Sequence, residues 1–130
     1  MDYIGTKHEV ITKVTEEVTA GKMKSGSLSV LATPFMVALM EQAAAELCEK
    51  FSPEGITTVG TALSIKHLAP TPVGATVKAV AQLLSFDGRK AEFRVEAYDD
   101  CGLIGEGTHE RFTVKSDRFM EKANERKINN

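Results

Sequence analysis

The stretch "LATPFMVALMEQAAAEL", residues 31–47, decides the fold expected for this chain. Thr33 is a favourable N-cap residue, and Pro34 suits the first helical position because its missing N–H costs no hydrogen bond there. Strong helix formers follow without an internal Gly or Pro, and Pro53 and Gly55 are stop signals beyond them. The first two turns are apolar on every side, which is typical of a buried helix. The sequence therefore predicts one long central helix that begins near Thr33.

One acid interrupts the apolar part of this helix. Glu41 comes directly after the apolar run 35–40 and shortly before the alanines at 43–45. A buried carboxylate is costly unless it is paired or takes up a proton. Glu41 therefore either faces solvent at a helix edge beside Gln42 or has a chemical task, and the helix pattern alone leaves both interpretations open.

The remainder of the chain is predicted mostly as strands. The first twenty residues lean towards strand, because Val10, Val14 and Val18 alternate with charged residues, and residues 21–29 resemble a loop. Alternating patterns and turn residues then predict four strands at 56–69, 73–86, 90–98 and 103–115, and a short helix at 116–127. Asp87-Gly88 is a hairpin signal between the second and third of these strands.

This order of elements predicts an α+β fold. Consecutive strands form an antiparallel sheet with one covered face, and the helix at Thr33 is the only large apolar element available to cover it. We therefore expect a hotdog fold, in which an antiparallel sheet wraps around one long central helix. A length of 130 residues suits a single domain that spans 1–130.

Composition excludes several classes of function. The net charge of −2 gives no electrostatic footprint for nucleic acid or an anionic membrane. No apolar run approaches the roughly 20 residues of a membrane-spanning helix, and the first ten residues lack the pattern of a signal peptide. Cys48 and Cys101 are far apart and have no metal-ligand spacing, so we expect free thiols, a cytoplasmic location and no metal.

Three segments carry a resemblance to a known family. "ATPFMVALMEQA" (32–43), "VGTALSIKHLAPTPVGATVKA" (59–79) and "GEGTHERF" (105–112) resemble the fluoroacetyl-CoA thioesterase-like branch of the hotdog superfamily. The similarity extends over about residues 5–122. The resemblance implies a homodimer that hydrolyses acyl-CoA thioesters without a metal or an organic cofactor. It also implies catalytic roles for Thr33, Glu41 and His67 and substrate-binding roles for Gly60 and Arg111.

The catalytic candidates each have a plainer interpretation as well. Thr33 can serve only as an N-cap, or it can present its hydroxyl beside helix N–H groups that suit an oxyanion. Glu41 can act as a base on water or as a nucleophile. His67 is expected on one strand face with Val59, Thr61, Leu63 and Ile65, where a histidine is either a core residue or a proton donor for the departing thiolate.

The binding candidates are equally open. Gly60 can mark a bulge or allow substrate to lie close to the backbone. Arg111 can contact a CoA phosphate or carboxylate, or pair with a surface acid. The G-x-G of residues 105–107 is followed by no helix, so strand glycines with close neighbours explain it better than a dinucleotide loop.

One segment departs from the family pattern, and two other functions remain open. The stretch "MKSGSLSV" (23–30) has no aromatic residue, whereas the fluoroacetyl-specific member is aromatic-rich there, so the sequence predicts a short or substituted acyl-CoA as substrate rather than selectivity for fluoroacetyl-CoA. A hotdog hydratase or dehydratase also uses a His and a carboxylate. A non-catalytic acyl-CoA-binding module is the alternative from another class.

Overall fold

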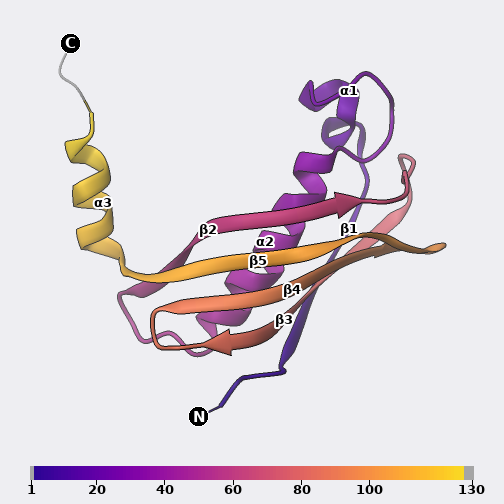
Figure 1. Ribbon diagram of the computed structural model, residues 1–130. Helices are drawn as coiled ribbons and strands as arrows, with labels where there is room; N and C mark the ends of the chain where they lie inside the picture. Colours follow the sequence, from indigo (N-terminus) through magenta and orange to yellow (C-terminus); the bar gives the residue numbers. More distant parts are fainter. Residues whose placement is uncertain (1, 128–130) are drawn as a thin grey trace.

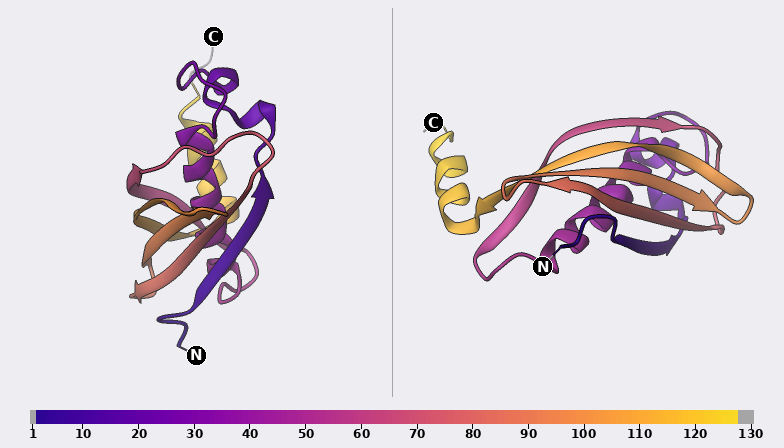
Figure 2. Two further views of the ribbon diagram at one scale, coloured as in Figure 1. Left: turned by 90° about the vertical axis from the view of Figure 1, so that its right-hand side faces the viewer. Right: turned by 60° about the horizontal axis from the view of Figure 1, so that its bottom comes forward.

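A computed structural model describes residues 2–127. Its elements are β1 (Lys7–Lys13), the 3-10 helix η1 (Glu16–Val18), α1 (Ala20–Met23), α2 (Thr33–Glu49), β2 (Ile56–His67), β3 (Thr76–Phe86), β4 (Lys90–Asp99), β5 (Gly102–Lys115) and α3 (Ser116–Glu125). All strand pairs are antiparallel in one five-stranded sheet of order β1-β3-β4-β5-β2. The curved sheet arches over α2, while α3 projects away from the body (Figures 1 and 2).

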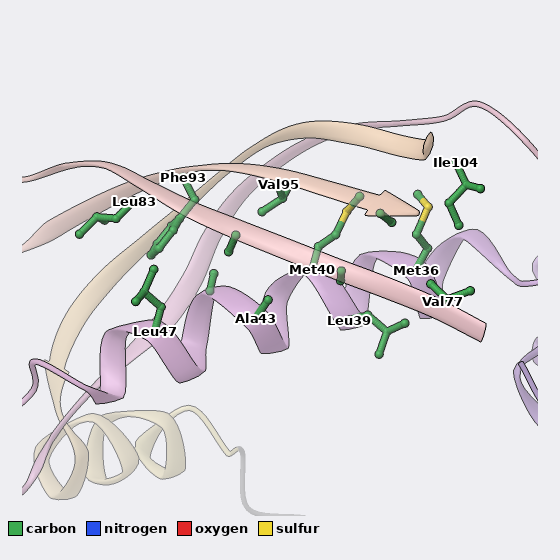
Figure 3. Close-up of a cluster of buried hydrophobic side chains, with 14 of the residues drawn as sticks. Met36, Leu39, Met40, Ala43, Leu47, Val77, Leu83, Phe93, Val95 and Ile104 are labelled. Carbon is green, nitrogen blue, oxygen red and sulfur yellow. The ribbon is translucent and has the colours of Figure 1, made fainter. Parts of the chain in front are cut away.

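The core lies between α2 and the sheet, as the sequence predicts. Figure 3 shows side chains of α2 pointing at the strands, where Phe93 is the largest side chain that is fully buried. The helix contributes one face of this core: Met36, Leu39, Met40, Ala43, Ala44, Leu47 and Cys48. Small residues on the facing strands, such as Ala79 and Ala97, let the backbone of α2 approach the sheet closely. Within residues 2–127, no helix is long and apolar enough to cross a membrane.

The β3–β4 hairpin confirms the Asp-Gly signal. The Asp87 carboxylate accepts hydrogen bonds from the backbone N–H groups of Arg89 (2.9 Å) and Lys90 (2.7 Å). Gly88 has a φ of 95°, a conformation that side chains other than glycine rarely adopt. The turn chemistry thus fixes the position at which the chain reverses.

The strand expected over the first twenty residues is wrong after Lys13. β1 ends where Lys13 pairs with Thr76, which is the first residue of β3, and the backbone pairing continues only for one more residue, with bonds from Val14 to Ala75 and from Gly74 to Val14. Beyond that point the chain turns into η1 and α1, and the Thr19 hydroxyl accepts from the N–H of Lys22 at the start of α1. The length of the partner strand therefore overrides the local alternation.

A bulge in β2 changes which residues share a face. The register with β5 shifts between Gly60 and Ala62, so Gly60 lies opposite Arg111 while Ala62 already lies opposite Glu110. One extra residue reverses the alternation of side chains. Gly60 therefore joins Leu63, Ile65 and His67 on the face that meets α2, and the expected place of Val59 and Thr61 on that face is wrong.

Candidate active site

The first group of the site is a hydrogen-bonded pair at the start of α2. The Thr33 hydroxyl lies 2.7 Å from Nδ1 of His67, which is the last residue of β2. The prediction of Thr33 as an N-cap is wrong, since Ala32 occupies that position and provides no side-chain cap. The hydroxyl is bonded to the imidazole instead, so the two residues are coupled chemically.

Only one of the two ring nitrogens of His67 forms a hydrogen bond. Its Nε2 is buried and has no hydrogen-bond partner among residues 2–127. The residue itself lines an open surface groove together with Thr33, Val30, Leu68 and Ala69. Burial lowers the pKa of His67 below 6.5, so the neutral imidazole is the favoured form near neutral pH. A buried polar atom without a partner next to a groove is suited to bind a further group.

The second group surrounds Glu41. Its Oε2 lies 3.9 Å from Nη1 of Arg111, and 39% of the Glu41 side chain is exposed. A Cβ atom placed on Gly60 would lie only 2.6 Å from the same oxygen and 3.4 Å from the same nitrogen. The missing side chain of Gly60 therefore leaves room for the carboxylate, and Glu41 has a partner rather than only solvent.

Arg111 is buried rather than free on the surface. Its Nε donates to the Thr58 hydroxyl and its Nη2 to the Thr58 carbonyl, both at 2.9 Å. Burial lowers the pKa of Arg111 from its ordinary value, although a guanidinium stays charged at any physiological pH. The side chain thus presents a fixed positive charge towards Glu41.

His109 completes the second group, and the site residues predicted from the sequence do not include it. Its Nε2 lies 3.2 Å from Nη1 of Arg111, and its Nδ1 lies 2.9 Å from the carbonyl oxygen of Ala62. The signal for it was its place two residues before Arg111 on the same strand face. Among residues 2–127, no cluster of three or more His, Cys, Asp or Glu side chains could hold a metal ion.

The two groups of one chain lie apart. Thr33 and Glu41 are about two turns distant along α2, and Gly60 and His67 are roughly 20 Å apart along β2. No hydrogen bond or ion pair of the described residues joins Glu41 to Thr33 or His67. Contacts within one chain therefore do not join these three residues into one group.

The two glycines of the predicted G-x-G have close neighbours, as expected. A Cβ on Gly107 would collide with the backbone oxygen of Ser64, and one on Gly105 would lie 2.6 Å from the Met36 side chain. Both positions therefore require a residue without a side chain for packing between strands and helix.

The comparisons place these groups in a family. A family model for FlK, the fluoroacetyl-CoA-specific thioesterase, matches residues 14–117, and this range includes Thr33, Glu41, Gly60, His67 and Arg111. The chain belongs to the fluoroacetyl-CoA thioesterase family. The resemblance read from the sequence is thus confirmed.

Comparisons with single proteins support the same family and fold. A fluoroacetyl-CoA thioesterase from Streptantibioticus cattleyicolor is 40% identical over 97 residues, which covers 75% of this chain and 70% of the relative. A solved structure of the fluoroacetyl-CoA thioesterase FlK has a TM-score of 0.93 at 31% identity, covering 98% of this chain and 99% of that one. A hot-dog-like protein from Thermanaerovibrio acidaminovorans, 24% identical with a TM-score of 0.87 over the whole of both chains, shares the fold. The predicted α+β hotdog fold is confirmed.

The buried His109 and the half-buried His67 predict a pH-dependent stability. Burial lowers the pKa values of His67 and His109 in the folded chain, whereas the unfolded chain titrates at about 6.5. Below about pH 6.5 the unfolded state binds more protons, so the free energy of unfolding is complete above that pH and falls as pH drops towards the folded pKa values. Urea unfolding of the wild type between about pH 7.5 and pH 5 measures this fall.

The matched variant for this measurement is His67→Gln, which removes one of the two titrating groups. Its free energy of unfolding should depend less steeply on pH over the same range. A wild-type free energy that stays constant or rises as pH falls from 6.5 would contradict the burial of neutral histidines.

Proposed function

We propose that this chain is an acyl-CoA thioesterase that hydrolyses a short or substituted acyl-CoA to the free acid and CoA. The observation that carries the proposal is the 2.7 Å hydrogen bond between Thr33 and His67 at the start of α2, in a chain of a thioesterase family. The start of a helix favours negative charge, and the oxyanion of a thioester under attack is such a charge.

The surroundings of this pair support a small acyl group. The open groove beside His67 is bordered by Ala20, Ser25 and Val30 rather than by aromatic residues. The segment 21–29 over it is exposed throughout. Structures of mutants of the fluoroacetyl-CoA thioesterase FlK include complexes with acetyl-CoA and with fluoroacetate and CoA. Acetyl- to butyryl-sized groups, including substituted ones, fit this setting better than long chains.

The proposed active form is a homodimer joined through β2. This strand is at the edge of the sheet, and five successive residues in its middle, Gly60–Ser64, are exposed. An edge strand presents unpaired N–H and C=O groups that a second copy can pair with around a two-fold axis. Leu63, with 41% of its surface exposed on the α2-facing side of the sheet, would be covered by such a partner.

The dimer would unite the two groups of the site. Because Thr61 is the extra residue of the bulge, an antiparallel pairing of two β2 strands around a two-fold axis at Ser64 puts Gly60 of one protomer opposite His67 of the other. Directly opposite residues lie about 5 Å apart on one face of a sheet. Because the bulge gives Gly60 and His67 the same face, Glu41 and Arg111 of one protomer would then border the Thr33–His67 pair of its partner. Each dimer would contain two such sites.

The residues have distinct roles in the proposed reaction. Glu41 takes a proton from water as the water oxygen attacks the thioester carbonyl, or the carboxylate attacks the carbonyl itself and water then cleaves the anhydride. The start of α2 stabilises the oxyanion, while Arg111 and the space at Gly60 position the substrate. His67, aligned by Thr33, assists the proton transfer to the departing CoA thiolate. CoA is part of the substrate, and one water is consumed in either route.

The location proposed for the enzyme is the cytoplasm. Cys48 is buried and Cys101 is exposed, and both are free thiols in this chain. Free cysteines suit a reducing compartment, which is also where acyl-CoA substrates would meet the enzyme.

A colorimetric thiol-release assay over a panel of acyl-CoAs tests the function. Acetyl-, propionyl-, butyryl- and fluoroacetyl-CoA are compared with a long-chain acyl-CoA, and release of free CoA should be fastest for the short group. Cleavage of long chains only would contradict the proposed pocket. Conversion of an enoyl-CoA without thiol release would support the hydratase, and binding without any turnover would support the binding module.

A further inference from the structure

His109 has two hydrogen bonds that together define its protonation. Nδ1 lies 2.9 Å from the carbonyl oxygen of Ala62, which can only accept, so Nδ1 carries a proton. Nε2 lies 3.2 Å from Nη1 of Arg111, which can only donate, so Nε2 offers its lone pair. The imidazole is therefore neutral and in the Nδ1–H tautomer.

The surroundings of His109 favour this neutral state. The residue is 2% exposed and its ring packs near Phe93, with 6.1 Å between ring centroids. Burial is the largest cause that lowers its pKa, and the positive charge of Arg111 lowers it further. Glu41 from α2 and Glu110 on β5 act in the opposite direction, as does the bond to Ala62, and they are outweighed.

Among residues 2–127, His109 provides the one hydrogen bond to the Arg111 side chain that does not come from Thr58. Thr58 holds Nε and Nη2, and it leaves Nη1 to His109 and to Glu41, whose Oε2 is 3.9 Å away. Nη1 is thus the nitrogen that faces the carboxylate, and its direction depends on the His109 lone pair.

The same imidazole also contacts the bulge of β2. Ala62 is the residue at which regular pairing with β5 resumes, and its carbonyl accepts from His109. A Cβ on Gly60 would be 3.1 Å from Cε1 of His109. One ring therefore connects the strand distortion that makes room at Gly60 with the cation that faces Glu41.

We propose that His109 is a positioning residue that fixes the Nη1 edge of Arg111, and that its Nδ1–H bond to Ala62 at the β2 bulge keeps the Nε2 lone pair turned towards that nitrogen. It aligns the positive charge beside Glu41 without adding a second one. The role deepens the proposed thioesterase function and rests on it, since the aligned arginine would then act on the bound acyl-CoA.

Three substitutions separate the two bonds of His109. His109→Gln can place an amide oxygen near the former Nε2 and accept from Arg111, while it loses the bond to Ala62. His109→Asn can donate to the Ala62 carbonyl from near the former Nδ1 but is too short to reach Arg111. His109→Phe retains the ring shape and removes both bonds.

The expected order of kcat/KM is wild type, then Gln, then Asn and Phe. A hydrogen bond to a charged group corresponds to a loss of about 10- to 100-fold for Asn and Phe, whereas Gln should remain within about threefold of wild type. In an Arg111→Ala background, His109→Asn should cause no further loss, because its target is already absent. The role would be overturned if His109→Asn had the same kcat/KM as wild type. It would also be overturned if His109→Asn lowered kcat/KM as much in the Arg111→Ala background as in wild type.

A readout independent of turnover separates this role from the proposed function. Nitrogen-15 NMR of the histidines, assigned by comparison with His109→Gln, should show His109 in the neutral Nδ1–H form at pH 7. The Arg111 side-chain N–H protons should exchange slowly in wild type and His109→Gln and faster in His109→Asn. A protonated or Nε2–H His109, or equal exchange in Asn and wild type, contradicts the positioning role even in an active thioesterase. If the NMR spectra are as expected but the protein releases no thiol from any acyl-CoA, the positioning role of His109 is supported and the thioesterase function is rejected.

Discussion

Glu41→Gln should lower kcat/KM for the best short acyl-CoA by about a thousandfold or more, with the fold intact. The amide has the same shape as the carboxylate, but it neither removes a proton from water nor attacks a carbonyl. Because 39% of the Glu41 side chain is exposed, the amide can be solvated and no buried group is left without a partner. Thiol release at saturating and limiting substrate measures the loss, and thermal unfolding verifies the fold.

The matched control is Glu46→Gln on the same helix. Glu46 bonds to Gln42 and His8 on the exposed side of α2, and among residues 2–127 it has no hydrogen bond or ion pair with a residue of the proposed site. Its kcat/KM should stay within about threefold of wild type, as expected for a surface substitution. Glu41→Gln activity comparable to that of Glu46→Gln would remove the carboxylate from the mechanism and favour the interpretation of Glu41 as a solvent-facing residue.

A heterodimer of two inactive variants, Glu41→Gln and His67→Ala, should recover part of the thioesterase activity. Glu41→Gln on one protomer and His67→Ala on the other leave one composite site with both wild-type residues. A heterodimer purified through two different tags should therefore show about half of the wild-type activity, since one of its two symmetric sites is intact. Each parent homodimer should be nearly inactive in the thiol-release assay.

The reverse arrangement is the control for this experiment. When Glu41→Gln and His67→Ala are placed on the same protomer and its partner is wild type, both composite sites lose one residue and the heterodimer should be nearly inactive. Sites built within one chain would give the opposite pattern, with half activity in this arrangement and none in the mixed one. A protein that stays monomeric at assay concentration would contradict pairing through β2.

Much of the fold could be predicted from local patterns. The helix from Thr33, the Asp87-Gly88 turn and the clean alternation of β4 each depend on neighbours in the sequence, and the structure agrees with all of them. The strand expected beyond Lys13 failed because its length is set by the partner β3, whose pairing with β1 begins at Thr76. The end of β1 depends on a strand more than sixty residues away, and such a distant contact leaves no trace in the hydrophobic alternation of residues 14–20.

The sequence by itself determined the elements from Thr33 onwards, the buried helix with its single interrupting acid, and the residue types of the site. Only the tertiary structure decided how these side chains are grouped. The bulge between Gly60 and Ala62 reverses one face of β2, and Thr33 bonds to His67 instead of capping α2. His109 became significant only through its bonds to Ala62 and Arg111. Helix and strand periods follow from local backbone geometry, whereas a bulge and a hydrogen bond across 34 or 47 residues depend on how separate elements meet.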